Sequence, residues 1–142
     1  MKHITRAICG LTVLTVPTIE FGGYFLLNVI SGREADLALT SFQESMYRAG
    51  HAHAGVLVIL ALVALLLSDH SRLGKLPMWI VRLGFPLSSI LISGGFFAAA
   101  TGDQLTEPND LISILYIGLV LLAVALILLG VGLLKKLPSS KK

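Results

Sequence analysis

Two histidines, His51 and His53, stand at the start of an apolar stretch that runs from Ala52 to Leu67. Inside a membrane an imidazole ring costs desolvation energy unless it binds something, so histidines at membrane depth are by default candidates for function. The pair therefore indicates a metal or cofactor site. The alternative is a pair of interfacial histidines that bond only to a neighbouring loop or to lipid headgroups.

The spacing of the two histidines bears on the kind of ligand. Residues two apart on an α-helix differ by about 200° in azimuth, so both rings can face one ion only if the turn is unwound. Ala54 and Gly55 lie three and four places beyond His51 and leave room beside the rings for a wide, flat group. A haem held by one imidazole fits this pattern better than a bare ion, and copper is the alternative metal that imidazoles bind readily.

The composition of the chain is that of a membrane protein. Its 142 residues are 55% hydrophobic and 13% charged, with a mean hydropathy of +0.86. Four apolar stretches have the length of about 20 residues that a helix needs to cross ~30 Å of hydrocarbon. They cover residues 7–30, 50–67, 79–100 and 111–134. We predict an all-α fold, an integral membrane bundle of four transmembrane helices that forms a single domain over residues 1–142.

Charges at the ends of these stretches predict the orientation. Lysines and arginines precede the first stretch, surround the second connection and close the chain, whereas the third connection, 101–110, carries only acids. The positive-inside rule then places both termini in the cytoplasm and the protein in the cytoplasmic membrane. His51 and His53 would lie near the outer face. The net charge of +3 reflects this arrangement, so no nucleic-acid binding is expected.

Two features are predicted to shape the elements. Pro17 removes a backbone donor and should kink the first helix. Residues 31–48 form the only long connection and are predicted to be an amphipathic outer loop on the membrane surface. The third helix carries small residues at spacings that permit close contact between helices: Gly84, Ser88, Ser89, Ser93, Gly94 and Gly95.

Several polar residues could share the histidine site. Tyr24 and Asn28 lie four apart on one face of the first helix, at the depth of His53, and either line the same cavity or bond to other helices. Arg48 lies just before the histidines and either neutralises a haem propionate or extends to the interface. Glu20, near mid-depth, is either a neutral carboxyl bonded to serines of the third helix or a partner of a histidine.

A resemblance rests on the first half of the chain. Residues 21–32 read FGGYFLLNVISG, and Arg48 and the run Ala52-His53-Ala54-Gly55 follow after the long connection. These features resemble the small membrane isomerases typified by styrene oxide isomerase and, more distantly, hydroxylaminobenzene mutase. Those are four-helix proteins of similar size. The likeness covers the first two helices and, more weakly, Gly95-Phe96-Phe97 on the third.

The resemblance implies a homotrimer that binds haem b near its subunit boundaries, with His53 in the position of the axial ligand. The family opens an epoxide to an aldehyde without net redox change, and ferric iron acts as a Lewis acid on the epoxide oxygen. The family pattern has an asparagine six residues after the ligand and a tyrosine on the third helix. This chain has Ile59 and Phe97 there, and Tyr24, Asn28 or Tyr116 could take over the polar role.

The expected function is therefore a haem-dependent isomerase that acts on a small apolar, aryl epoxide, with Tyr24, Asn28 and Phe97 at the reaction site. The alternative is a non-catalytic haem or copper carrier, or an electron-transfer protein, that uses both His51 and His53. A third class is a structural membrane protein without a cofactor.

Overall fold

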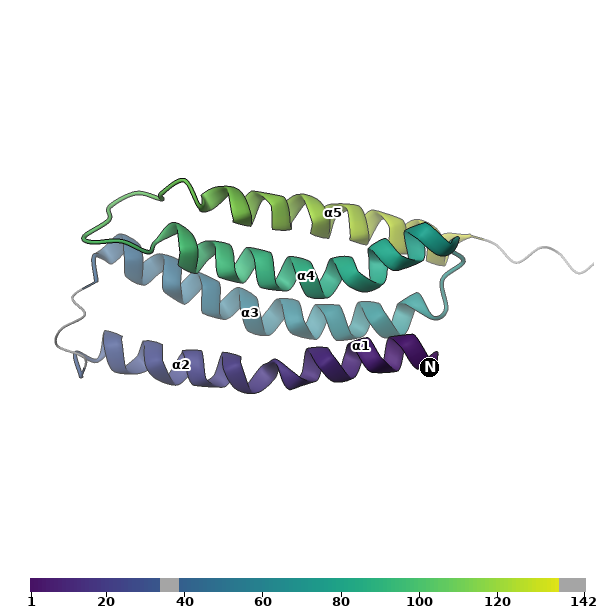
Figure 1. Ribbon diagram of the computed structural model, residues 1–142, viewed down its shortest axis with the longest axis horizontal. Helices are drawn as coiled ribbons and strands as arrows, with labels where there is room; N and C mark the ends of the chain where they lie inside the picture. The colour runs from purple at the N-terminus through teal and green to yellow at the C-terminus, as the bar shows by residue number, and fades with distance from the viewer. Residues whose placement is uncertain (34–38, 136–142) are drawn as a thin grey trace, which may run out of the picture.

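The computed structural model describes residues 1–33 and 39–135, and over these residues the chain forms helices and no strands (Figure 1). The helices are α1 (His3–Leu14), α2 (Val16–Ile30), α3 (Ser41–Ser68), α4 (Lys75–Ala99) and α5 (Ile112–Leu134). Helices α1 and α2 follow one another as a single span. The described residues thus contain four helices long and apolar enough to cross a membrane, as predicted, and suggest a multi-pass membrane protein.

The break between α1 and α2 confirms the expected effect of Pro17. Helix α1 ends at Leu14, and Pro17 lies in the first turn of α2, where its missing N–H has no helical partner to lose. At the joint the Thr15 amide donates to the Thr12 carbonyl at 3.1 Å, and the Thr18 amide donates to the Thr15 carbonyl at 3.1 Å. These bonds pair the amides of Thr15 and Thr18 across the joint between the two helices.

The prediction of an amphipathic outer loop over residues 31–48 is wrong for the second half of that range. Helix α3 begins at Ser41, so residues 41–48 are its first turns, while residues 34–38 lie outside the described residues. The cause is a capping box. The Gln43 amide donates to Thr40 Oγ1 at 3.2 Å, and the Thr40 amide donates to Gln43 Oε1 at 3.1 Å. The Thr-x-x-Gln pattern in the sequence is the signal for this helix start.

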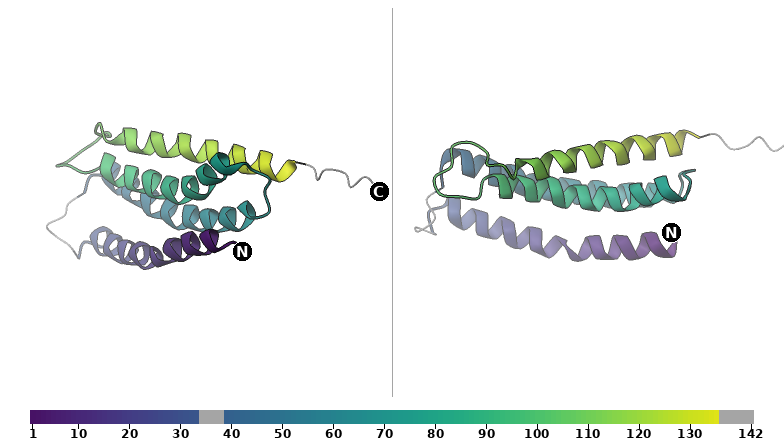
Figure 2. Two further views of the ribbon diagram at one scale, coloured as in Figure 1. Left: turned by 45° about the vertical axis from the view of Figure 1, so that its right-hand side comes forward. Right: turned by 45° about the horizontal axis from the view of Figure 1, so that its top comes forward.

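Helices α3, α4 and α5 form the tightly packed part of the molecule (Figure 2). A Cβ atom added at Gly95 on α4 would lie 2.6 Å from the Leu115 amide nitrogen of α5, and one at Gly118 would lie 2.8 Å from Ile92 Cγ1. The small residues of the third predicted helix therefore do permit close helix contact. The core of this part consists of Ala61, Ala64, Val81, Phe85, Ala125 and Leu129.

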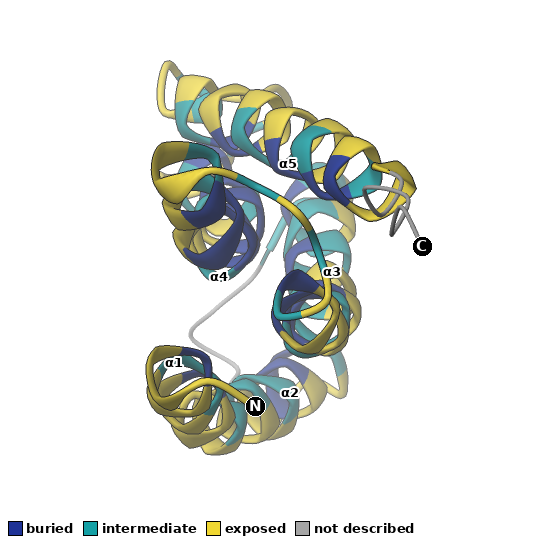
Figure 3. Ribbon diagram, turned by 90° about the vertical axis from the view of Figure 1, so that its right-hand side faces the viewer, coloured by how far each residue is buried: buried dark blue, intermediate teal, exposed yellow. Residues whose placement is uncertain are grey.

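Helices α1 and α2 form an arm that packs mainly on α3. Seen along the bundle, the arm lies on one side of α3, and α4 and α5 lie beyond it (Figure 3). Of the most apolar part of the arm, 11% of the residues are buried, compared with 50% for α4. The arm therefore depends on few contacts to stay in place.

Asp69, directly after α3, fastens the start of this arm. Its Oδ2 accepts from the Lys2 amide at 2.6 Å, and its Oδ1 accepts from Thr5 Oγ1 at 2.6 Å and from Arg82 Nη2 of α4 at 3.0 Å. The side chains of Arg82 and Asp69 are 8% and 9% exposed. Burial alone would raise the pKa of Asp69, but these donors favour the carboxylate more strongly and lower its pKa to about 2.

Candidate functional site

His53 lies on α3 with its ring exposed and fixed in orientation. Its Nδ1 is 2.7 Å from the Ala49 carbonyl oxygen. A carbonyl only accepts, so Nδ1 is the donor, and in the neutral ring Nε2 then has a lone pair. The ring also lies against Phe96 of α4, with the ring centroids 4.9 Å apart and the planes tilted by 31°. His53 therefore presents Nε2, on a ring held by this bond and by Phe96, at the surface of the chain.

His70, two residues beyond the end of α3, shows which part of this arrangement is ordinary. Its Nδ1 makes the same kind of bond, to the Leu66 carbonyl, at 3.2 Å. A histidine bonded to the carbonyl four residues earlier is thus a local feature of this helix. What distinguishes His53 is its position within the apolar part of α3 and its contact with Phe96.

His51 lies against α2 instead of α4. A Cβ atom on Gly23 would be 2.7 Å from His51 Cε1 and 2.8 Å from its Nε2, so only glycine lets the ring approach the α2 backbone this closely. Within residues 1–33 and 39–135 the ring of His51 has no hydrogen bond. The two histidines therefore contact different helices.

Arg48 and Gly55 flank the histidines without strong contacts of their own. Arg48 Nη2 is 3.5 Å from Glu44 Oε2, and the two side chains are 57% and 37% exposed, so this pair contributes little to stability. The space beside Gly55 is open, because a Cβ atom there would have no neighbour within 4 Å. Both residues remain available to a bound group.

The structure places the three predicted reaction-site residues in different surroundings. Asn28 is buried and its Oδ1 accepts from Arg33 Nη1 at 3.5 Å, whereas Tyr24 is 64% exposed. Phe97 packs on Tyr47 with ring centroids 5.4 Å apart and covers Gly50. Tyr47 was not singled out in the sequence. An aromatic residue six positions before His53 gives no pattern that would have marked it.

Within the described residues, Glu20 bonds neither to the serines of α4 nor to a histidine, the two alternatives considered from the sequence. It is exposed on α2, and Ser88 and Ser89 bond instead to carbonyls of their own helix, those of Phe85 and Pro86. The sequence fixes the depth of Glu20 along its helix but not the direction in which that helix presents it.

Within the described ranges, no three histidine, cysteine, aspartate or glutamate side chains come close enough to hold a bare metal ion. A haem needs only one protein nitrogen, because its porphyrin supplies the other ligands in the plane of the iron. His53 Nε2 offers that nitrogen, so the residues present fit a haem better than an ion held by protein alone. In comparisons with protein-family models, curated proteins and solved structures, nothing matches this chain.

Proposed function

We propose that this chain is a multi-pass protein of the cytoplasmic membrane, with both termini inside, that binds haem b through His53 and isomerises small apolar, aryl epoxides to aldehydes. One observation carries the proposal. The Nδ1–H of His53 is bonded to the Ala49 carbonyl, and Nε2 is left free beside the Phe96 ring. Histidines that ligate metals are held in this way, with the second ring nitrogen donating to a carbonyl or carboxylate.

The surface around His53 supports the same assignment. Ala52, Val56 and Ile59 are exposed on α3 and are all uncharged, so a flat apolar group meets no obstructing charge there. A single chain leaves this surface uncovered. A homo-oligomer, a trimer if the resemblance holds, would cover it from the other side. Arg48, with most of its side chain exposed, is the cation proposed to neutralise a propionate.

A bound ferric haem would supply a Lewis acid for the epoxide oxygen. The protein's own part is to hold the iron through His53 and to keep water away from it. The Phe96 and Phe97 rings, together with Tyr47, provide apolar cover on the α4 side of α3. Of the two polar candidates for orienting the substrate, Asn28 already bonds to Arg33, whereas the Tyr24 hydroxyl has no bond within the described residues. We therefore assign the orienting role to Tyr24.

The electron-transfer alternative needs a second axial ligand. His51 and His53 of one chain contact α2 and α4 respectively, so a second imidazole would have to come from a neighbouring copy. A six-coordinate, low-spin spectrum would be the signature of that arrangement.

The test is the absorption spectrum of the purified protein, reconstituted with haem b if it is isolated without it. We expect a Soret band that His53→Ala removes and that His51→Ala leaves in place. His70→Ala is the matched control, because His70 has the same carbonyl bond just beyond the far end of α3. A band that survives His53→Ala would overturn the ligand assignment.

The second part of the test measures the proposed reaction. Protein loaded with haem is incubated with styrene oxide, and phenylacetaldehyde is measured. We expect product with the native chain, none with His53→Ala, and about a three- to tenfold loss of activity with Tyr24→Phe, which removes one hydrogen bond in the transition state. A stable six-coordinate haem with no product would contradict the isomerase and favour electron transfer.

A further inference from the structure

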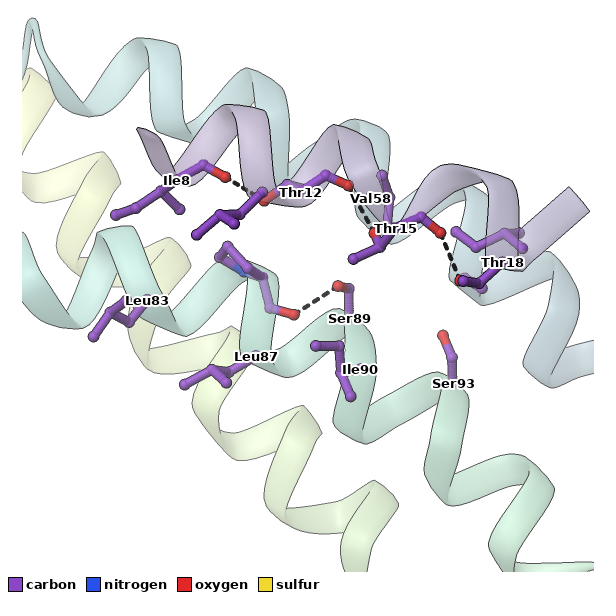
Figure 4. Close-up of a pocket in the computed structure, with 14 residues that line it drawn as sticks. Ile8, Thr12, Thr15, Thr18, Val58, Leu83, Leu87, Ser89, Ile90 and Ser93 are labelled. Atoms are coloured by element: carbon purple, nitrogen blue, oxygen red, sulfur yellow. Dashed lines mark hydrogen bonds between the residues drawn. The ribbon is translucent and has the colours of Figure 1, made fainter. Parts of the chain in front are cut away.

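A cavity of about 350 Å³ lies between the arm formed by α1 and α2 and helix α4, with α3 at its base (Figure 4). Ile8, Thr12 and Ile19 line it from the arm, and Ala54 and Val58 line it from α3. On α4 the lining residues extend from Leu83 to Ser93, which is roughly 15 Å at the helical rise per residue. The cavity is therefore elongated along the bundle, and its volume lies within the range of small-molecule sites.

The lining of the cavity carries no charged side chain. Most of its hydroxyl groups are already bonded to carbonyls of their own helix. Thr12 Oγ1 donates to Ile8 at 2.9 Å, Thr15 Oγ1 to Thr12 at 2.7 Å, and Ser89 Oγ to Pro86 at 2.7 Å. The walls thus offer an occupant an apolar surface.

Ser93 differs from these residues. It is 7% exposed, and its Oγ has no hydrogen-bond partner among the described residues. The other two serines of α4, Ser88 and Ser89, bond to carbonyls three residues earlier, and Ser93 does not. In Figure 4 its side chain lies at one end of the cavity and points toward the arm. A buried hydroxyl without a partner is costly, so a ligand that supplied one would be favoured.

We propose that this cavity binds an elongated, uncharged, apolar molecule with one hydrogen-bonding oxygen at its end, and that Ser93 Oγ bonds to that oxygen. A plain hydrocarbon chain fits the walls but carries no oxygen to meet Ser93. None of the residues proposed to hold haem lines the cavity, so the two proposals can be tested separately.

The test uses the purified full-length protein and a photoreactive decanol that carries a diazirine on its alkyl chain. Labelled peptides are identified by mass spectrometry. We expect labelling at the buried cavity walls, Val58 and Ser89 among them, and competition by 1-decanol that is several-fold stronger than by n-decane. Ser93→Ala should weaken decanol binding about three- to tenfold, the effect of one hydrogen bond.

Ser89→Ala is the matched control, since Ser89 lines the same cavity but its hydroxyl is already bonded to Pro86. It should bind decanol as the native chain does. Ser93→Thr keeps the hydroxyl and should retain binding, which separates loss of the bond from misfolding. Ala54→Phe should fill the cavity and remove the label. Equal competition by decane and decanol, equal labelling of Ser93→Ala, or labels scattered over the lipid-facing surface would each overturn the proposal.

Discussion

Asp69 is the residue on which three helices converge, although no sequence pattern marks it. The Lys2 amide and Thr5 are 67 and 64 residues away from it in the chain, and Arg82 is 13 residues away. From the sequence, Arg82 reads as one of the positive charges near a cytoplasmic turn. The structure places it inside α4, buried and paired. Breaking such a pair leaves one buried charge without a partner, which costs more than the pair itself contributes.

We predict that Asp69→Asn destabilises the protein by about 3 kcal/mol at neutral pH, because it leaves the buried Arg82 guanidinium without a negative partner. Reversible unfolding in detergent measures this change. The pKa of Asp69 is lowered from 3.8 to about 2, so its stabilising effect is present above about pH 4 and is lost as the pH falls from 4 through 2. The native chain should lose stability in that window, and the variant should not.

Glu44→Gln serves as the control, since it breaks the exposed pair with Arg48 and should change stability by less than about 1 kcal/mol. If both variants unfold alike, Asp69 does not fasten the arm as described.

The candidate site, like Asp69, could be predicted from the sequence only in part. The residue types pointed to the histidines, but only the fold shows which side chains surround them. His51 and His53 stand out in the sequence because imidazoles are rare in apolar helices. The residues that surround these two histidines cannot be identified from the sequence. That His51 lies on Gly23 and His53 on Phe96 depends on how α2 and α4 are placed around α3, which one sequence does not specify.

At the scale of elements, hydrophobic length and Pro17 were sufficient to predict three of the four spans to within a few residues. The start of α3 was missed because its first turns are polar, and hydropathy alone places the boundary where the apolar residues begin. The local signal, Thr40 with Gln43, was present but short. The small residues of α4 predicted that this helix packs closely against another helix. They did not predict that the partner is α5, because small residues indicate close contact but not which helix makes it.

Adjacent glycines on α4 provide a test of that packing. A Cβ atom at Gly95 would lie 2.6 Å from the Leu115 amide nitrogen, whereas one at Gly94 would have no neighbour within 4 Å. We predict that Gly95→Ala destabilises the protein by about 1–3 kcal/mol, because α4 and α5 must move apart. Gly94→Ala should be neutral or stabilise by up to about 1 kcal/mol through helix propensity. Unfolding of both variants in one detergent measures the difference, and a similar effect at the two positions would contradict this view of the contact.

At the scale of the whole molecule, the chain consists of a compact group, α3 to α5, and an arm that is attached at few points (Figure 3). The joint at Thr15 further divides the arm, and the cavity separates part of it from α4. Local stability follows burial and contact density, so the arm should open more readily than the rest.

We predict that amides around Thr15 exchange with deuterium faster than amides around Ser88 on α4. Hydrogen-exchange mass spectrometry in a single detergent measures both. Asp69→Asn should speed exchange further at the start of α1 while leaving α5 unchanged, because Asp69 bonds to Lys2 and Thr5. Equal protection of α1 and α4 would show that the arm is as firmly held as the core.

The bond between Arg82 and Asp69 also bears on how the chain enters its membrane during synthesis. A lone arginine at the centre of a transmembrane segment raises the free energy of insertion by about 3 kcal/mol, and Arg82, in the third turn of α4, should raise it by less. Helix α4 would meet that barrier if it left the translocon by itself. If α4 emerged together with α3, it would enter the bilayer with its arginine already paired with Asp69 at the turn. We therefore expect the two helices to partition into lipid as a hairpin, with Asp69→Asn lowering the yield of integrated chains before any folded protein is measured.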